Sequence, residues 1–226
     1  AADGAAPRAV AVLLHPKHGD RRAMLGRARL LRAEGYASVL VDLQAHGESP
    51  GEQLTLGHLE RHDVAATAAF ARERHPDLPL VVIGWSLGGA AAVLAEDLGA
   101  DALVLEAVFA SLEQAASDRL ADHFGAWARP LTPLLTLQLP LRLGVSASEL
   151  APVDHIGAVG CPVLVLGGTL DTDTPPSESR RLHAAAPPGS ELVLFDGAAH
   201  VNLQRHDPEL WRASVLGFLE RHLPDR

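Results

Sequence analysis

The sequence predicts an α/β protein built on one mostly parallel sheet of about six strands. Short apolar runs rich in β-branched residues alternate with longer helical patterns from one end of the chain to the other. These runs lack a clean alternation of apolar and polar residues, as expected for strands that helices cover on both faces. The 226 residues, of which 47% are hydrophobic, suffice for one well-buried core. We therefore expect a single domain over residues 1–226.

The expected elements follow one another in a regular order. The expected strands cover residues 9–14, 38–43, 80–83, 102–105, 163–166 and 192–195. The expected helices cover residues 21–34, 56–74, 87–98, 177–186 and 208–222, and each follows a loop that contains Gly, Pro, Asp or Ser. The order fails once, between about residues 109 and 150, where three prolines interrupt apolar helix-like pieces. This insertion predicts a small helical cap over one end of the sheet.

The overall charge limits the class of ligand. The net charge is -9 and the sequence pI is about 5.7, whereas nucleic acids and anionic membrane surfaces select proteins with clustered Lys and Arg. We therefore expect a small-molecule ligand and no nucleic acid. No apolar stretch approaches the ~18 residues of a membrane span, and the N-terminus lacks the pattern of a signal peptide. We expect no membrane span and a cytoplasmic location.

The cysteine and histidine content does not indicate a metal or a cofactor. A single cysteine, Cys161, excludes an internal disulfide and a Cys-based zinc cage, and its place before an apolar run predicts a core position. His58 and His62 lie four residues apart on an expected helix, but no third ligand accompanies them. We interpret them as a solvated helix face and expect neither metal nor cofactor.

The most informative segment is Leu80-Val-Val-Ile-Gly-Trp-Ser-Leu-Gly-Gly, in which an expected strand runs through Gly84-Trp85-Ser86-Leu87-Gly88 into an alanine-rich helix. A serine at such a strand-to-helix turn exposes its hydroxyl at the helix N-terminus, and the flanking glycines let the two backbones approach. An ordinary Gly-rich turn is the alternative. The setting between strand and helix favours Ser86 as a nucleophile.

A serine nucleophile needs a base, and the base needs a carboxylate that fixes its tautomer. The last expected strand runs into Asp196-Gly-Ala-Ala-His200, and the preceding strand into Gly-Gly-Thr-Leu-Asp171. The order Ser, Asp, His is the chain order that this geometry requires on a parallel sheet. Asp173, two residues beyond Asp171, and Glu106, which ends the fourth expected strand, also compete for the role of the acid.

These motifs together resemble the α/β-hydrolase superfamily, in particular its bacterial serine esterases and lysophospholipase-like members. Besides Gly84 to Gly88, the resemblance rests on His15-Pro16, on Asp42-Leu-Gln-Ala-His-Gly-Glu-Ser-Pro-Gly51, on Gly168-Thr-Leu-Asp171 with Thr174-Pro175, and on Gly197-Ala-Ala-His200. The resemblance implies the fold, the triad Ser86, His200 and Asp171, and acyl-transfer chemistry. Its spacing favours Asp171 over Asp173 and Glu106 as the acid. The loop His46-Gly47-Glu48-Ser49 is interpreted as structural.

An oxyanion formed during acyl transfer needs hydrogen-bond donors. The amide of Leu87, directly after the nucleophile, fits the first donor. Many relatives have His-Gly-X after the first of these strands, whereas this chain has His15-Pro16-Lys17, and because proline lacks an N–H the Lys17 amide is our candidate for the second.

Aromatic residues near the serine and in the cap are the candidates for contact with substrate. Trp85, Phe109 and Trp127, with Phe124 and the leucines of the cap, suggest an apolar acyl pocket; the alternative is that they only pack the cap. We expect hydrolysis of a small-molecule carboxylic ester or thioester. A peptidase, an acyltransferase and a non-catalytic binding module of the same fold are the other readings.

Relatives commonly open with an antiparallel pair of strands, but only about eight residues precede the first expected strand here. We therefore expect a reduced, six-stranded sheet without that pair. The strand 38–43 then becomes a sheet edge, and exposed apolar edges tend to pair with other chains. The expected consequence is a homodimer, or a segment that covers the edge.

Overall fold

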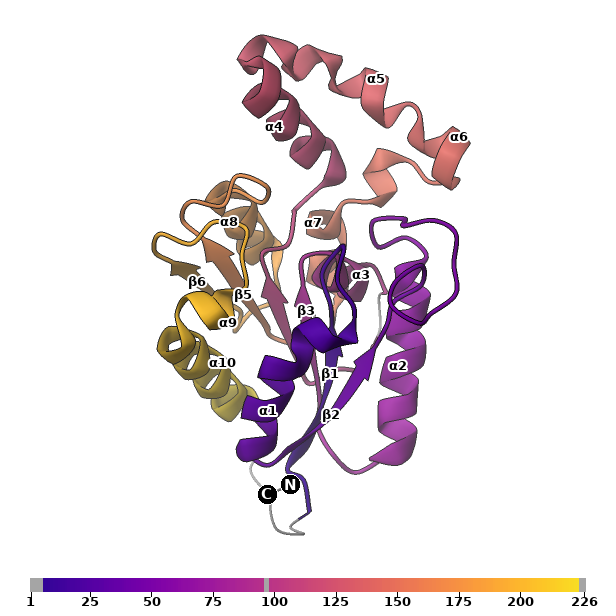
Figure 1. Cartoon of the computed structure of the whole chain (residues 1–226). Helices are drawn as coiled ribbons and strands as arrows, with labels where there is room; N and C mark the ends of the chain where they lie inside the picture. Colours follow the sequence, from indigo (N-terminus) through magenta and orange to yellow (C-terminus); the bar gives the residue numbers. More distant parts are fainter. Residues whose placement is uncertain (1–5, 96–97, 224–226) are drawn as a thin grey trace.

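The computed structural model describes residues 6–95 and 98–223, and in them six parallel strands form one sheet with helices on both faces (Figure 1). The strand order is β2-β1-β3-β4-β5-β6. The strands are β1 (Ala9–Leu14), β2 (Tyr36–Val41), β3 (Leu80–Trp85), β4 (Ala102–Glu106), β5 (Val163–Gly168) and β6 (Glu191–Phe195). The chain leaves β1 to one side for β2 and returns to the other side for β3. The connections that leave the carboxyl ends of β1 and β3 therefore run in opposite directions. Open α/β sheets bind ligands at such a point.

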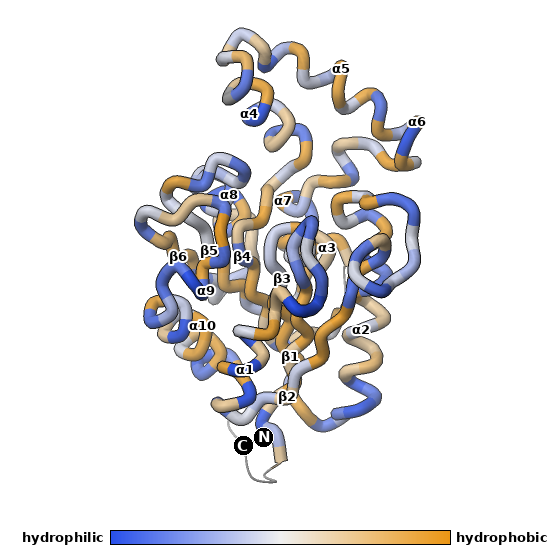
Figure 2. The backbone as a smooth tube through the Cα atoms, viewed as in Figure 1, coloured by the Kyte–Doolittle hydropathy of each residue, from blue (hydrophilic) through white to orange (hydrophobic). Residues whose placement is uncertain are grey.

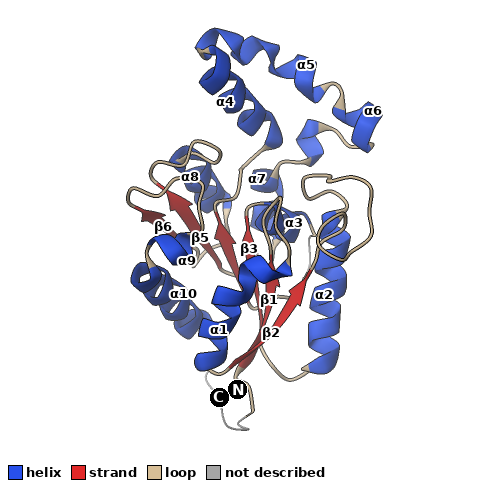
Figure 3. Cartoon of the chain, viewed as in Figure 1, coloured by secondary structure: helices blue, strands red, loops and turns tan. Residues whose placement is uncertain are grey.

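Helices lie on both sides of the sheet (Figure 3), and two hydrophobic clusters sandwich it. Alternate residues of each strand face opposite clusters, as in β1, where Val10, Val12 and Leu14 face one cluster and Ala11 and Leu13 face the other. The first cluster is covered by α2 (Glu60–Arg74), α3 (Leu87–Leu94) and α8 (Pro176–Ala185). The second is covered by α1 (Leu25–Ala33), with the 3-10 turn η2 (Arg21–Met24) before it, and by α10 (Pro208–His222). Figure 2 shows the strands as the most hydrophobic part of the chain, as expected for a sheet buried on both faces.

Several boundaries differ by a few residues from the sequence-based expectation, and two of the differences have a clear local reason. β2 ends at Val41 because the Asp42 carboxylate binds loop amides instead of continuing the strand. The helix expected from residue 56 begins at Glu60, since the Glu60 carboxylate accepts the N–H groups of Thr55 (2.7 Å) and Gly57 (2.9 Å) and holds a non-helical turn before it. The helix expected over 87–98 is α3, which ends at Leu94; residues 96–97 lie outside the described part of the chain.

The segment between β4 and β5 rises from the sheet as a cap (Figure 1). It contains α4 (Leu112–Phe124), η3 (Ala126–Leu131), α5 (Thr132–Thr136), α6 (Leu139–Leu143) and η4 (Ala147–Glu149), and α7 (Pro152–His155) and η5 (Ile156–Ala158) lead back to β5. Its two ends meet in a narrow neck, where Leu112 donates to the Leu150 carbonyl (2.9 Å) and Val153 to the Ala110 carbonyl (2.9 Å). The short helix α9 (Leu203–His206) lies between β6 and α10. No helix in the described residues is long and apolar enough to cross a membrane.

Strand β2 forms one edge of the sheet, as predicted, and in the described part of the chain its outer side carries no strand. A shallow groove of about 340 Å³ lies between this strand and α1, and Ser38 and Leu40 line it together with Ala28. The backbone of an edge strand carries unpaired N–H and C=O groups that can bind a second strand.

We predict that this edge mediates self-association, giving a homodimer that dissociates on dilution. Static light scattering over a concentration series measures the state. Ser38→Lys places a charge in the groove and should shift the protein to the monomer. A wild-type protein that stays monomeric at high concentration would rule the homodimer out.

Candidate active site

Ser86 lies at the sharp turn between β3 and α3, with φ 50° and ψ -111°, a conformation that L-residues rarely adopt. The turn depends on glycines on both sides. A Cβ on Gly84 would lie 2.4 Å from the Cα of Gly89, and one on Gly88 would lie 2.6 Å from the Cβ of Leu14. Real side chains do not approach so closely, so the turn forms only where the sequence has glycine.

Hydrogen bonds hold Ser86 at the start of α3. Its N–H donates to the Glu106 carbonyl of the neighbouring strand (2.8 Å), and its own carbonyl accepts from Ala90 (3.0 Å). Leu87 is the first residue of α3, where an amide has no helical acceptor and is free to bind a ligand anion.

Asp171 and His200 form a hydrogen-bonded pair on neighbouring loops. His200 Nδ1 lies 2.8 Å from Asp171 Oδ2. The loops after β5 and β6 are joined by a bond from Leu170 N–H to the Ala198 carbonyl (2.8 Å), and a Cβ on Gly168 would lie 2.3 Å from that oxygen. The glycine therefore permits the approach that brings acid and imidazole together.

The Asp171 carboxylate is fully buried and accepts several further donors. Oδ1 accepts the N–H groups of Asp173 (2.9 Å) and Thr174 (2.8 Å), and Oδ2 accepts the Thr174 hydroxyl (2.8 Å). Bonds from such donors stabilise the ionised carboxylate. The geometry therefore fixes the position of the carboxylate that faces His200.

The other two candidates for the acid are engaged elsewhere. Glu106 is fully buried and makes a two-pronged contact with Arg27 of α1, with 2.7 Å between Arg27 Nε and Glu106 Oε1. Asp173 makes an ion pair with Arg119 of the cap helix α4. Neither carboxylate has a hydrogen bond to His200, in contrast to Asp171.

The imidazole of His200 is about three quarters buried, with 25% of its side chain exposed. Burial alone would lower the pKa of His200, because it disfavours the charged ring. The hydrogen bond and the negative charge of Asp171 outweigh burial, and they raise the pKa of His200 above its ordinary value.

His15 shapes the loop that carries Lys17. The Leu43 N–H donates to His15 Nε2 (3.0 Å), so this nitrogen carries no proton, and Nδ1 donates to the Pro16 carbonyl (2.9 Å). This arrangement holds the neutral ring, and burial also lowers the pKa of His15. The ring thereby anchors the turn after β1 on which Lys17 lies.

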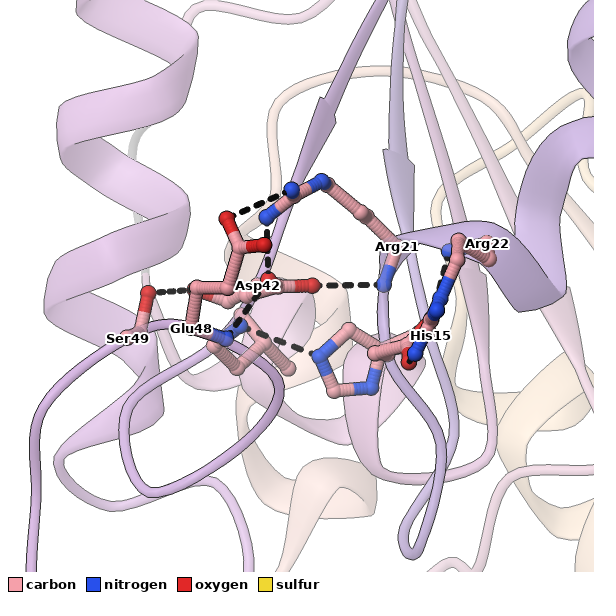
Figure 4. A network of polar contacts seen from close by, with 8 residues as sticks. His15, Arg21, Arg22, Asp42, Glu48 and Ser49 are labelled. Carbon is pink, nitrogen blue, oxygen red and sulfur yellow. Dashed lines mark hydrogen bonds and ion pairs between the residues drawn. The ribbon is translucent and has the colours of Figure 1, made fainter.

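A network centred on Asp42 joins the loops after β1 and β2 (Figure 4). Asp42 accepts the N–H groups of Arg21 (2.7 Å) and Glu48 (3.0 Å) and pairs with the Arg21 guanidinium, which also contacts the Glu48 carboxylate. A Cβ on Gly47 would lie 2.3 Å from the Asp42 carboxyl group, so glycine is required there. The loop of residues 46–49 therefore supports the neighbouring turn and contributes no group to the lining of the cavity.

A cavity of about 890 Å³ lies between the carboxyl ends of the strands and the cap. Ser86, Leu87, His200 and Lys17 all line it, together with Trp85 and Phe109. Trp127 does not line it, and this residue is 71% exposed. It follows Gly125 (φ 94°), which ends α4 and turns the chain. The geometry thus brings together the predicted polar residues and two of the three predicted aromatic residues.

One face of α4 forms the roof of the cavity; the sequence analysis named its aromatic residues and the leucines of the cap, but not the helix face that they share. The apolar lining residues around this face are Phe109, Leu112, Ala116, Leu120, Phe124 and Leu135. Leu112, Ala116 and Leu120 recur every four residues, which is the spacing of one helix face. That spacing was the available signal. Polar residues of the cap also line the cavity, namely Arg119 and His123.

Residues 5–151, more than half of the chain, match the family described as serine aminopeptidase, S33. The uncharacterized protein YqkD of Bacillus subtilis (strain 168) is 25% identical over 191 residues, which are 82% of this chain and 63% of that protein. An uncharacterized protein of Mycobacterium tuberculosis (strain ATCC 25618 / H37Rv) is 31% identical over 205 residues, 88% of this chain and 63% of that protein. The chain thus spans less than two thirds of the length of these relatives.

Named enzymes are similar as well. A pimeloyl-[acyl-carrier protein] methyl ester esterase of Neisseria meningitidis serogroup B (strain ATCC BAA-335 / MC58) is 29% identical over 219 residues, 80% of this chain and 81% of that enzyme. The Pyrococcus furiosus esterase Pf2001 superposes with a TM-score of 0.76 at 22% identity, over 96% of this chain and 85% of that chain. The Paleococcus ferrophilus monoacylglycerol lipase superposes with a TM-score of 0.71 at 21% identity, over 96% of each chain.

The likeness in structure shows the fold, and the match over residues 5–151 shows the family. The six-stranded sheet, its strand order and its helical cap have the architecture expected for that fold. The chain has the α/β-hydrolase fold and belongs to the serine aminopeptidase S33 family.

Proposed function

We propose that this protein is a serine hydrolase that cleaves carboxylic esters with an apolar acyl group. The observation that carries the proposal is the 2.8 Å hydrogen bond between His200 and a buried Asp171 beside a cavity that also contains Ser86. The strained turn at Ser86 supports it, since backbone strain concentrates at functional sites.

In the proposed mechanism, His200 removes the proton of the Ser86 hydroxyl as the oxygen attacks the ester carbonyl. The carbonyl oxygen gains negative charge, and the amides of Leu87 and Lys17 donate hydrogen bonds to it. His200 then gives its proton to the departing alcohol, which leaves an acyl group on Ser86. Water, deprotonated by His200, attacks this acyl group; the bond to Ser86 breaks, His200 returns the proton to the Ser86 oxygen, and the acid is released. Asp171 orients the imidazole and stabilises its charged form throughout.

The charges around the cavity favour an ester over the substrate of an aminopeptidase. An aminopeptidase must receive a positively charged amino terminus, for which a free carboxylate is the natural partner. Among the described residues, Asp173 is the one carboxylate that lines the cavity, and it is paired with Arg119. Lys17, which also lines the cavity, is a cation and would repel the amino group.

Replacing the nucleophile tests the proposal directly. Ser86→Ala should lower kcat on p-nitrophenyl esters by on the order of 10⁶-fold, because the group that forms the acyl-enzyme is lost. The same variant should lose labelling by a fluorophosphonate probe while its circular dichroism and thermal unfolding stay close to wild type. Hydrolysis retained by Ser86→Ala would refute the proposal.

Variants of the acid provide the matched comparison. Asp171→Asn should lower kcat by up to ~10⁴-fold with little change in KM, because the amide holds the imidazole in the wrong tautomer. Asp173→Asn removes the same charge two residues away and should cost far less. The reverse order of these two effects would contradict the assignment of Asp171.

The activity should depend on pH through His200, which accepts a proton only when neutral. Since the pKa of His200 is raised from 6.5, kcat/KM should be low in acid and rise with a midpoint above pH 6.5. In Asp171→Asn, burial still lowers the pKa of His200, but the hydrogen bond and the charge that raise it are gone. The residual activity of this variant should therefore rise at lower pH than that of wild type. A pH–rate profile that is flat between pH 5 and 8 would exclude His200 as the base.

The cavity roof should set the acyl chain length. Ala116 faces the cavity from α4, so Ala116→Trp fills acyl space and should lower kcat/KM for long-chain esters at least ~10-fold relative to short ones. Ser117→Trp is the control, because residue 117 does not line the cavity. A panel of p-nitrophenyl esters of graded length measures both. An unchanged chain-length profile in Ala116→Trp would place the acyl group elsewhere.

A further inference from the structure

A buried ion pair lies beneath the nucleophile turn and has no part in the mechanism above. Arg27 of α1 and Glu106 at the end of β4 are both fully buried. Arg27 Nε lies 2.7 Å from Glu106 Oε1, and Arg27 Nη2 contacts Glu106 Oε2, so the guanidinium and the carboxylate make a bidentate contact. The two indole rings of Trp85 and Trp211 lie 5.2 and 5.7 Å from the guanidinium carbon.

Stability alone does not explain this pair. Taking two charges out of water is costly, and a buried ion pair can often be exchanged for apolar residues of similar size without loss of stability. Here the third nitrogen of the guanidinium, Arg27 Nη1, has no hydrogen-bond partner among the described residues, and an unpaired buried donor adds to the cost. The pair therefore calls for a second role.

The contacts of the pair point to the nucleophile. Glu106 uses its side chain to bind Arg27 and its main-chain carbonyl to accept the N–H of Ser86 (2.8 Å). Trp85, the residue before Ser86, lies opposite Glu106 in the pairing of β3 with β4, and its ring faces Arg27. The residue before the strained serine and the residue that accepts the serine N–H are thus both tied to the Arg27 guanidinium.

We propose that Arg27 and Glu106 are positioning residues that hold Trp85 and Ser86 in the geometry of attack. A residue with φ 50° and ψ -111° keeps that conformation only where its surroundings enforce it. The bidentate pair holds the end of β4 in place, and the Glu106 carbonyl at that end holds the Ser86 amide. The guanidinium over the Trp85 ring holds the residue before Ser86. This inference rests on the proposed function of Ser86.

The test replaces both charges together, so that no lone charge is left in the core. Arg27→Met with Glu106→Leu retains volume and should unfold at a denaturant midpoint close to wild type. Its kcat on a p-nitrophenyl ester should nevertheless fall on the order of 10²-fold, because small displacements of a reacting group have effects of this size. The rate of fluorophosphonate labelling of Ser86 should fall in parallel, while KM changes little.

A surface pair with the same chemistry serves as the matched control. Arg221 and Glu191 also make a two-pronged contact, but this pair lies near the surface. Glu191 begins β6, at the end of that strand away from the loop that carries His200. Arg221→Met with Glu191→Leu should leave kcat and the labelling rate unchanged.

Arg27→Lys, which keeps the charge but loses the planar fork, is the conservative variant and should retain more activity than the double replacement.

The pH profile separates positioning from a direct role of Glu106 as the acid. The pair makes no hydrogen bond with Asp171 or His200, so the double variant should keep the wild-type pH midpoint at a lower rate.

A shifted midpoint, or wild-type kcat and labelling in a folded double variant, would overturn the inference. If the double variant does not fold, a folded Arg27→Lys with wild-type kcat overturns it instead. A wild-type protein that neither hydrolyses esters nor reacts with the probe would overturn the proposed function, and with it this inference.

Discussion

The close approach of α3 to the carboxyl ends of β1 and β3 is the constraint on which the rest of the site depends. Two glycines, Gly84 and Gly88, remove the side chains that would separate these backbones, and Gly89 does the same against Val108. The approach forces Ser86 into a strained turn and leaves the Leu87 amide at a free helix start. A bulkier residue at any of these glycines would move α3, and with it the serine and the first oxyanion donor.

Buried carboxylates fix the loops around this turn. Asp42 joins the loops after β1 and β2, Glu60 holds the turn before α2, and Asp171 organises the turn after β5, each by accepting main-chain N–H groups. Glu178 does the same at the neck of the cap, where it accepts the Ala110 N–H. Hydrogen bonds to ionised groups are about twice as strong as neutral ones. The irregular segments that carry the chemistry are therefore held as firmly as the sheet.

The cap differs in character from the body. Many of its large apolar side chains are exposed, among them Leu134, Leu137 and Leu141, whereas β1, β4 and β5 beneath are buried throughout. Two hydrogen bonds at the neck join the ends of the cap to each other, and the pair between Arg119 and Asp173 joins the cap to the loop after β5. The body thus carries Ser86, Asp171 and His200, and in the function that we propose the apolar cap is the wall against which an acyl chain packs.

The sequence by itself determined the parallel six-stranded sheet, the turn at Ser86 and the loops that carry Asp171 and His200, because strand periodicity, glycine spacing and chain order are local properties. It left three carboxylates as candidates for the acid. The spacing of the resemblance favoured Asp171, and the tertiary structure adds that the other two are paired elsewhere, Glu106 with Arg27, 79 residues away in sequence, and Asp173 with Arg119, 54 residues away. The tertiary structure also decided that Phe109 faces the cavity and Trp127 faces solvent. Such outcomes follow from which distant side chains meet, and no local pattern of residues encodes that.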